Sequence, residues 1–168
     1  MRPGPGPRHR RLAGRAPRVG DRDPGTGGLS MSDTQEAPAL MSRPLPAPAV
    51  TLESKPFFDA AAEGRFLIKR CTACGEAHWY PRSVCPHCHS PETVWEESPG
   101  TGVIYTYSVM WRSPTGPYAI GYVTLDEGPA MLTNFVDVAP DGLSIGMRVK
   151  VKFQPTEGGP PAPVFAPA

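Results

Sequence analysis

The second half of the chain alternates apolar and polar residues with a period of two, the pattern of half-buried strands. Four runs show it, over residues 103–112, 118–125, 130–138 and 147–154. Turn-forming Gly, Pro and Asp residues separate the runs, and an apolar stretch at Val164 and Phe165 provides a fifth strand. Strands of this length and spacing predict a small antiparallel barrel, closed or partly open.

Strict alternation assigns the side chains of the first run to two opposite faces. One face carries Val103, Tyr105, Tyr107, Val109 and Trp111, and the other begins with Ile104 and Thr106. The last run is the most regular, with apolar residues predicted inward and basic residues outward.

Before the barrel, the pattern predicts a short amphipathic helix followed by a strand. Ser54 is placed to cap the helix, Pro56 suits its first turn, and Gly64 ends it. The strand is predicted at residues 66–68, directly before the first cysteine. The apolar face of the helix is predicted to contain Phe57, Phe58, Ala61 and Ala62.

The four cysteines form two Cys-x-x-Cys pairs with ten residues between them. Zn²⁺ accepts four thiolates in a closed tetrahedral site, so the pattern predicts a structural zinc ion. Gly75 is expected to supply a positive φ in one turn, and Pro86 presets φ in the other. Two disulfides or a single iron ion are the alternatives, and the lack of a secretory signal disfavours disulfides. The predicted ligands are Cys71, Cys74, Cys85 and Cys88.

Histidines and tryptophans lie close to the cysteines in the sequence. Because four thiolates complete a tetrahedron, His78, His87 and His89 are interpreted as solvated groups or as supports for the ligands. Trp79 and Trp95 are interpreted as the core of a small metal lobe, and stacking on a ligand is the weaker hypothesis.

Pro 23 and Gly 18 are concentrated at the two ends of the 168-residue chain. Residues 1–51 are predicted to form a disordered Arg-, Pro- and Gly-rich leader, followed by a helix and zinc ribbon over residues 52–98. Residues 99–168 are predicted to form the barrel and a C-terminal tail. Because Met31 offers a second start, we hypothesise that residues 1–30 are not part of the natural protein.

The charge is distributed unevenly. Residues 1–30 carry seven arginines and two aspartates, a net +5 within a whole-chain charge of +1, so the remainder carries −4. An acidic core disfavours a nucleic-acid partner. No apolar run is long enough for a secretory signal or a membrane span, so a cytoplasmic protein without a membrane partner is expected.

No catalytic motif is present in the sequence. It has no Gly-x-Ser-x-Gly, no His-Glu-x-x-His, no phosphate-binding Gly loop and no cysteine beyond the two pairs. Asp126, Glu127, Asp137 and Asp141 fall at turns and strand ends and are interpreted as solvated charges rather than a paired acid and base. The sequence therefore predicts a binding or assembly protein and not an enzyme.

Several segments together resemble the family labelled domain of unknown function 35. The resemblance covers about residues 54–166, nearly all of the predicted ordered part. The matching segments are Phe57-Phe58-Asp59, Gly64-Arg65-Phe66, Cys71-x-x-Cys74-Gly75, Tyr80-Pro81-Arg82-x-x-Cys85-Pro86-x-Cys88, Trp95, and the stretches at 100–105, 121–128, 145–149 and 163–165.

This resemblance implies a mainly β chain, with a rubredoxin-like zinc ribbon followed by a five-stranded oligonucleotide/oligosaccharide-binding (OB) barrel. Members of the family accompany acyl-CoA enzymes: lipid-transfer-type thiolases, steroid side-chain aldolases and hot-dog-fold hydratases. The resemblance implies an accessory subunit that docks on such a thiolase-like or hydratase partner. It would help to bind or channel acyl-CoA thioesters in lipid or steroid side-chain metabolism.

Only the four cysteines carry over from the family residue by residue. Tyr105, Tyr107 and Trp111 are candidates for a surface that meets CoA or the partner, although their alternation favours the barrel core. Two other functions stay open. One is single-stranded nucleic-acid binding by an OB barrel and zinc ribbon, and the other is electron transfer through iron held by the four thiolates.

Overall fold

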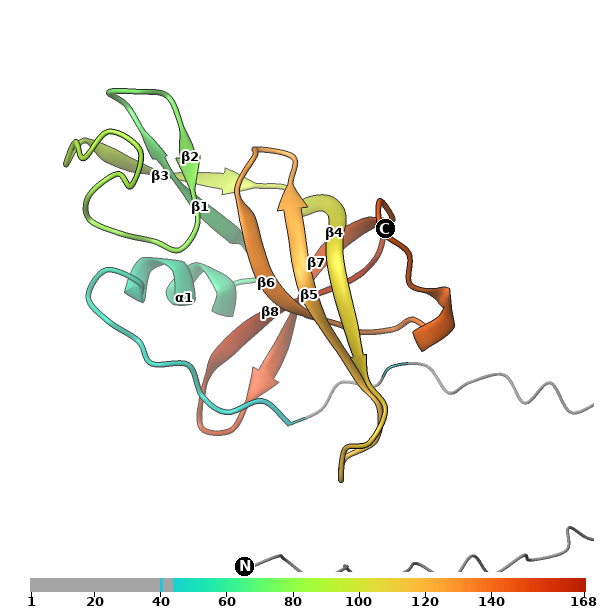
Figure 1. The fold of residues 1–168 in the computed structure, drawn as a ribbon. Coiled ribbons are helices and arrows are strands. Elements are labelled where there is room, and N and C mark those ends of the chain that lie inside the picture. Colours follow the sequence, from blue (N-terminus) through green and yellow to red (C-terminus); the bar gives the residue numbers. More distant parts are fainter. Residues whose placement is uncertain (1–39, 41–43) are drawn as a thin grey trace, which may run out of the picture. The chain divides into compact units, whose positions relative to one another are not determined.

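The computed structural model describes residue 40 and residues 44–168 (Figure 1). Most of the predicted leader, residues 1–39 and 41–43, lies outside the described residues. The elements follow one another in the order α1 (Lys55–Ala62), β1 (Phe66–Cys71), β2 (Ala77–His78), β3 (Thr93–Ser98), β4 (Thr101–Met110), β5 (Tyr118–Leu125), β6 (Ala130–Phe135), the 3-10 helix η1 (Pro140–Gly142), β7 (Arg148–Thr156) and β8 (Gly159–Pro167).

Helix α1 begins and ends where the sequence predicts, but two details differ. Ser54 occupies the N-cap position without a capping bond, because its hydroxyl accepts the amide hydrogen of Thr51 at 3.0 Å. Ala60 is buried in place of Ala62, which is exposed. Ala60 lies one turn after Phe57 and completes the buried stripe, whereas Ala62 lies beyond its edge.

The strands form two sheets. A three-stranded antiparallel sheet has the order β2-β1-β3, and its strand β1 pairs with β3 from Phe66 opposite Ser98 to Cys71 opposite Thr93. The other five strands close into a barrel of order β4-β5-β6-β8-β7, in which β6 and β8 are parallel and the other pairs antiparallel (Figure 1). The predicted zinc-ribbon region and five-stranded OB barrel are thus confirmed.

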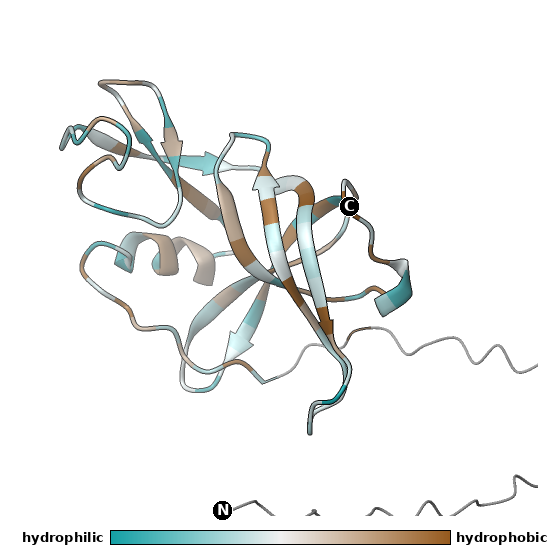
Figure 2. Ribbon diagram, viewed as in Figure 1, coloured by the Kyte–Doolittle hydropathy of each residue, from teal (hydrophilic) through white to brown (hydrophobic). Residues whose placement is uncertain are grey.

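Apolar and polar bands alternate along the barrel strands in Figure 2, as the sequence predicts. Strand β4 departs from strict alternation because its register with β5 shifts between Ile104 and Thr106. Ile104 is therefore buried, and Tyr105 next to it is 67% exposed. Tyr107 packs on the core as predicted, and its hydroxyl donates to the Leu143 carbonyl at 2.9 Å. The prediction of core positions for Tyr105 and Trp111 is wrong, since both side chains are exposed.

Order begins earlier in the chain than predicted. Leu40 is 1% exposed, its amide donates to the Val138 carbonyl at 2.7 Å, and its carbonyl accepts from the Asp137 amide. Leu45 is buried against Val136 and Val164. The sequence placed both leucines in the disordered leader. The residues that bury these two leucines lie about a hundred residues later in the chain, so the local sequence pattern does not predict their burial.

None of the helices in the described part of the chain is both long and apolar enough to cross a membrane.

We predict that Gly121→Ala destabilises the barrel. A Cβ at Gly121 would overlap the Thr106 carbonyl oxygen on β4 and lie 2.9 Å from Cε2 of Phe135. Because the overlap is with backbone at the β4 bulge, we expect a loss of about 1–3 kcal/mol in the free energy of unfolding, measured by urea denaturation. The control is Gly142→Ala, whose Cβ would approach only Cγ2 of Val138, at 3.3 Å. An equal loss in both variants would contradict this account of Gly121.

We also predict that Leu40→Ala lowers the free energy of unfolding by about 2–4 kcal/mol, because it leaves a cavity beside β6. Leu52, which is 93% exposed, supplies the control Leu52→Ala, with an expected change within about 0.5 kcal/mol. Thermal unfolding of the two variants would measure the difference. A Leu40→Ala protein as stable as the parent chain would show that the leucine contributes nothing.

Candidate metal centre

The two loops that carry the cysteines share one backbone pattern. In each loop, the amide of the first cysteine donates to the carbonyl five residues later, and its carbonyl accepts from the amide four residues later. Each loop is therefore a closed turn that holds two thiols on one side. The bonds join Cys71 to Glu76 and Gly75, and Cys85 to Ser90 and His89, at 2.9–3.0 Å.

A residue with left-handed backbone closes each turn. Gly75 has φ of 80°, as predicted from the sequence. In the second loop His89 occupies the equivalent position with φ of 62°. Sequence reasoning missed His89 because a histidine carries only a weak preference for this conformation. The repeated Cys-x-x-Cys motif could have identified it, because His89 directly follows Cys88 in the same way as Gly75 directly follows Cys74.

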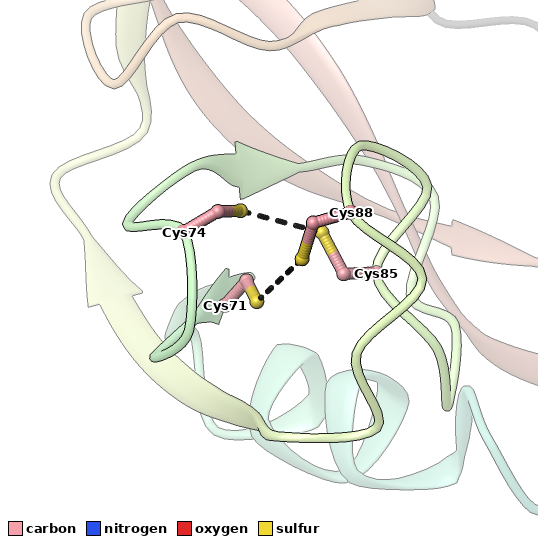
Figure 3. A group of neighbouring side chains, drawn as sticks. All are labelled: Cys71, Cys74, Cys85 and Cys88. Carbon is pink, nitrogen blue, oxygen red and sulfur yellow. Dashed lines mark hydrogen bonds between the residues drawn. The ribbon is translucent and has the colours of Figure 1, made fainter.

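The four sulfur atoms converge from the two loops (Figure 3). Cys71 Sγ lies 3.6 Å from Cys88 Sγ, Cys74 Sγ lies 3.8 Å from Cys85 Sγ, and all four atoms lie within 4.8 Å of one another. A tetrahedral zinc ion with Zn–S bonds of about 2.3 Å requires sulfurs about 3.8 Å apart. A disulfide requires about 2.05 Å. The separations fit a four-sulfur ion site and disfavour the two-disulfide alternative.

The thiols perturb one another's pKa values. Amide hydrogens of Cys74 and Ala73 stabilise the Cys71 thiolate and lower its pKa to about 7. For Cys74, the Glu76 amide lowers the pKa, but burial and the sulfurs of Cys88 and Cys71 outweigh it and raise the pKa to about 12. Several thiolates cannot share this small volume without a cation. The donor set therefore suits a divalent ion, and the structural zinc predicted from the sequence fits it.

The three nearby histidines differ in their environments. His87 and His89 are exposed, in agreement with their interpretation as solvated groups. His78 is instead 2% exposed, and neither of its ring nitrogens has a hydrogen-bond partner among the described residues. Burial lowers the pKa of His78, which favours the neutral ring. No histidine nitrogen joins the four-sulfur group found in the described part of the chain.

The tryptophans pack as structural residues. The ring of Trp79 lies 4.8 Å from that of Phe57 and is stacked on Phe66 at 5.8 Å. Trp95 is half-buried, and the Lys69 ammonium group lies over its ring, with Nζ 4.8 Å from the ring centre. These contacts support the interpretation of both tryptophans as packing residues.

A pocket of about 310 Å³ lies where the ribbon meets the turn between β5 and β6. Glu76, His78, Trp79 and His87 line it from the ribbon, and Glu127 lines it from the barrel. Oε2 of Glu127 is buried and has no hydrogen-bond partner within the described part of the chain. Sequence reasoning did not place these residues together, because they come from segments about fifty residues apart.

The carboxylates at the strand ends form ion pairs on the surface. Asp126 accepts two hydrogen bonds from Arg148, at 2.7 and 2.8 Å, and these lower its pKa to about 2. Asp137 pairs with Lys152 at 2.6 Å. The partners found for these two carboxylates among the described residues are cations and a hydroxyl group, and not a second carboxylate as in an acid and base pair. Their interpretation as surface charges fits this geometry, although both are paired with cations.

Family comparisons agree with the two halves of this architecture. The family model described as the ChsH2 rubredoxin-like zinc ribbon domain matches residues 58–94, and that of the ChsH2 C-terminal OB-fold domain matches residues 95–154. A probable enoyl-CoA hydratase alpha subunit of Thermomonospora curvata is 37% identical over 127 residues, which are 73% of this chain and 40% of that protein. The chain thus spans less than half the length of this relative.

Two further relatives resemble the chain more completely along their own length. A DUF35 domain-containing scaffold protein of Methanocaldococcus jannaschii is 36% identical over 92 residues, which are 51% of this chain and 64% of that protein. A solved structure described as Ltp2-ChsH2(DUF35) aldolase is 36% identical with a TM-score of 0.64, and the match covers 71% of this chain and 98% of that one. The chain therefore belongs to the domain of unknown function 35 family, with the rubredoxin-like zinc ribbon and OB-fold domain of ChsH2.

Proposed function

We propose that this chain is a non-catalytic accessory subunit that docks on a thiolase-like or hydratase enzyme. The observation that carries the proposal is the match to nearly the whole length of a chain described together with Ltp2 as an aldolase. The relative named as a scaffold protein supports the same role. The site itself agrees, because four thiolates around one ion leave no open position for substrate or water.

The proposed complex acts on acyl-CoA thioesters. The name of one relative, a probable enoyl-CoA hydratase alpha subunit, supports this substrate class. In this proposal the chain helps to bind the thioester or to pass it between active sites, in lipid or steroid side-chain metabolism. The complex is proposed to work in the cytoplasm, without a membrane partner.

We further propose that Cys71, Cys74, Cys85 and Cys88 are the zinc ligands. The ion would hold the two cysteine loops together and so stabilise the ribbon, which is proposed to extend over residues 52–98. The barrel is proposed to extend over residues 99–168. Zinc in such a site contributes to folding and does not change oxidation state.

We predict one zinc ion per chain, measured by elemental analysis, and a large loss of zinc in Cys85→Ser. The matched control is His87→Ala, which removes an exposed donor between two cysteines and is expected to keep full occupancy. Proton competition sets the pH dependence: because the free Cys74 thiol has a pKa raised to about 12, zinc binding must release its proton. Apparent zinc affinity should therefore rise as the pH increases from about 7. Iron in place of zinc, or full zinc in Cys85→Ser, would refute the assignment.

We predict that the chain co-purifies with a thiolase-like protein encoded beside it when the two are co-expressed. That enzyme should be insoluble or inactive when it is produced alone, and the purified chain should not turn over straight-chain or steroid CoA thioesters. Light scattering of the purified mixture, combined with activity assays, would test both points. Two independent and fully active monomers would refute the accessory role.

A further inference from the structure

One face of the barrel carries an unusual number of exposed apolar side chains. They lie on the outside of β4, β5 and β6. Tyr105 is 67% exposed and Leu132 is 57% exposed, so these side chains lie outside the core. We call this surface the β4–β6 face, defined by Tyr105, Met110, Ile120, Tyr122 and Leu132.

Strand pairing brings members of this face together. Tyr122, in the middle strand, lies opposite Thr106 on β4 and Leu132 on β6. Ile120 lies two residues before Tyr122 on the same side of β5, opposite Ser108 and Asn134. The side chains around the two apolar residues of β5 are thus uncharged. The shifted register at the β4 bulge turns Tyr105 outward, beside this group.

The three strands contain no Asp, Glu, Lys, Arg or His residue. Strand β7 of the same barrel shows the ordinary pattern, with Arg148, Lys150 and Lys152 on its exposed side. Solvent-facing strands usually carry charges, which keep them soluble and prevent edge association. A surface depleted of charge and rich in Tyr and large aliphatic side chains has the composition of the centre of a protein interface.

The described part of the leader does not cover this face. Leu45 packs on Val164, and Pro46 pairs with Glu157 beyond the end of β7, so this segment follows the β7–β8 side of the barrel. Residues 1–30 are a poor complement to an uncharged apolar surface, because they carry seven arginines and few large apolar residues. An external occupant fits the face better.

We infer that the β4–β6 face is the surface through which this chain docks on its enzyme partner, against an uncharged apolar patch of that enzyme. The inference rests on the proposed function, because a partner enzyme must exist for the face to be covered. Charge matching selects this class of occupant. A polyanion such as nucleic acid requires cations, which these strands lack, and a charged protein surface would bury its ions against this face without partners.

The test uses the full chain and the co-expressed thiolase-like protein. Tyr122→Lys and Leu132→Lys each place a charge at the centre of the proposed contact, and each is expected to weaken binding by about tenfold or more in a calorimetric titration. Leu52→Lys is the matched control, since Leu52 is 93% exposed and lies before α1, outside the β4–β6 face. Its affinity should stay within about twofold of the parent chain.

A second measurement uses the unaltered chain, so its result does not depend on whether the lysine variants fold. Hydroxyl-radical labelling of the side chains of Tyr105, Met110 and Tyr122 should fall by about threefold or more on complex formation, whereas labelling of Leu52 should not change. Parent-like affinity in both lysine variants, or unprotected side chains in the complex, would overturn the inference and leave the accessory role intact. No binding by the parent chain would refute the proposed function instead.

Two other occupants would also overturn the inference. If the chain alone sediments as a dimer that Leu132→Lys dissociates, the face joins two copies of this chain. If the side chains are already protected in the chain alone, and deletion of residues 1–35 exposes them, the leader covers the face. In either case the affinity for the thiolase-like protein would be governed by a different surface.

Discussion

The aromatic cluster around Phe66 is the contact on which the rest of this structure depends. Phe66 stands at the start of β1, and its ring contacts Trp79 in the ribbon, Phe57 in helix α1, and Phe153 and Phe165 in the barrel. Large rings in edge and stacked arrangements bury much apolar area at one point. One core therefore runs through helix, ribbon and barrel, and no element has to be stable by itself.

The cluster also connects the metal centre to the barrel. Trp79 lies between the two cysteine pairs in the sequence and packs on Phe66, which in turn contacts barrel side chains. The two cysteine loops have little apolar core of their own, so the ion and this aromatic contact are complementary supports for the ribbon. A closed sulfur site of this kind supplies rigidity and has no open position for a substrate, in agreement with the proposed accessory role.

The charges on the outside of the barrel lie at strand ends and on β7. Ion pairs such as Asp126 with Arg148 and Asp137 with Lys152 are exposed and individually weak. Strands β4, β5 and β6 themselves contain no charged residue. Such a division is expected of a subunit that must stay soluble before assembly and then bury one face, because only the uncharged face can be desolvated at low cost.

The sequence by itself determined the features that depend on short spacings. The two Cys-x-x-Cys pairs predicted which four sulfurs would lie together, Gly75 specified its turn, and the period-two runs located the barrel strands within a few residues. Tertiary structure decided the rest. The bulge after Ile104 turned Tyr105 to the solvent. Contacts with distant strands buried Leu40, and the junction between ribbon and barrel placed His78 near Glu127. Each of these outcomes requires two segments far apart in the chain to meet, and a pattern of neighbouring residues carries no information about that meeting.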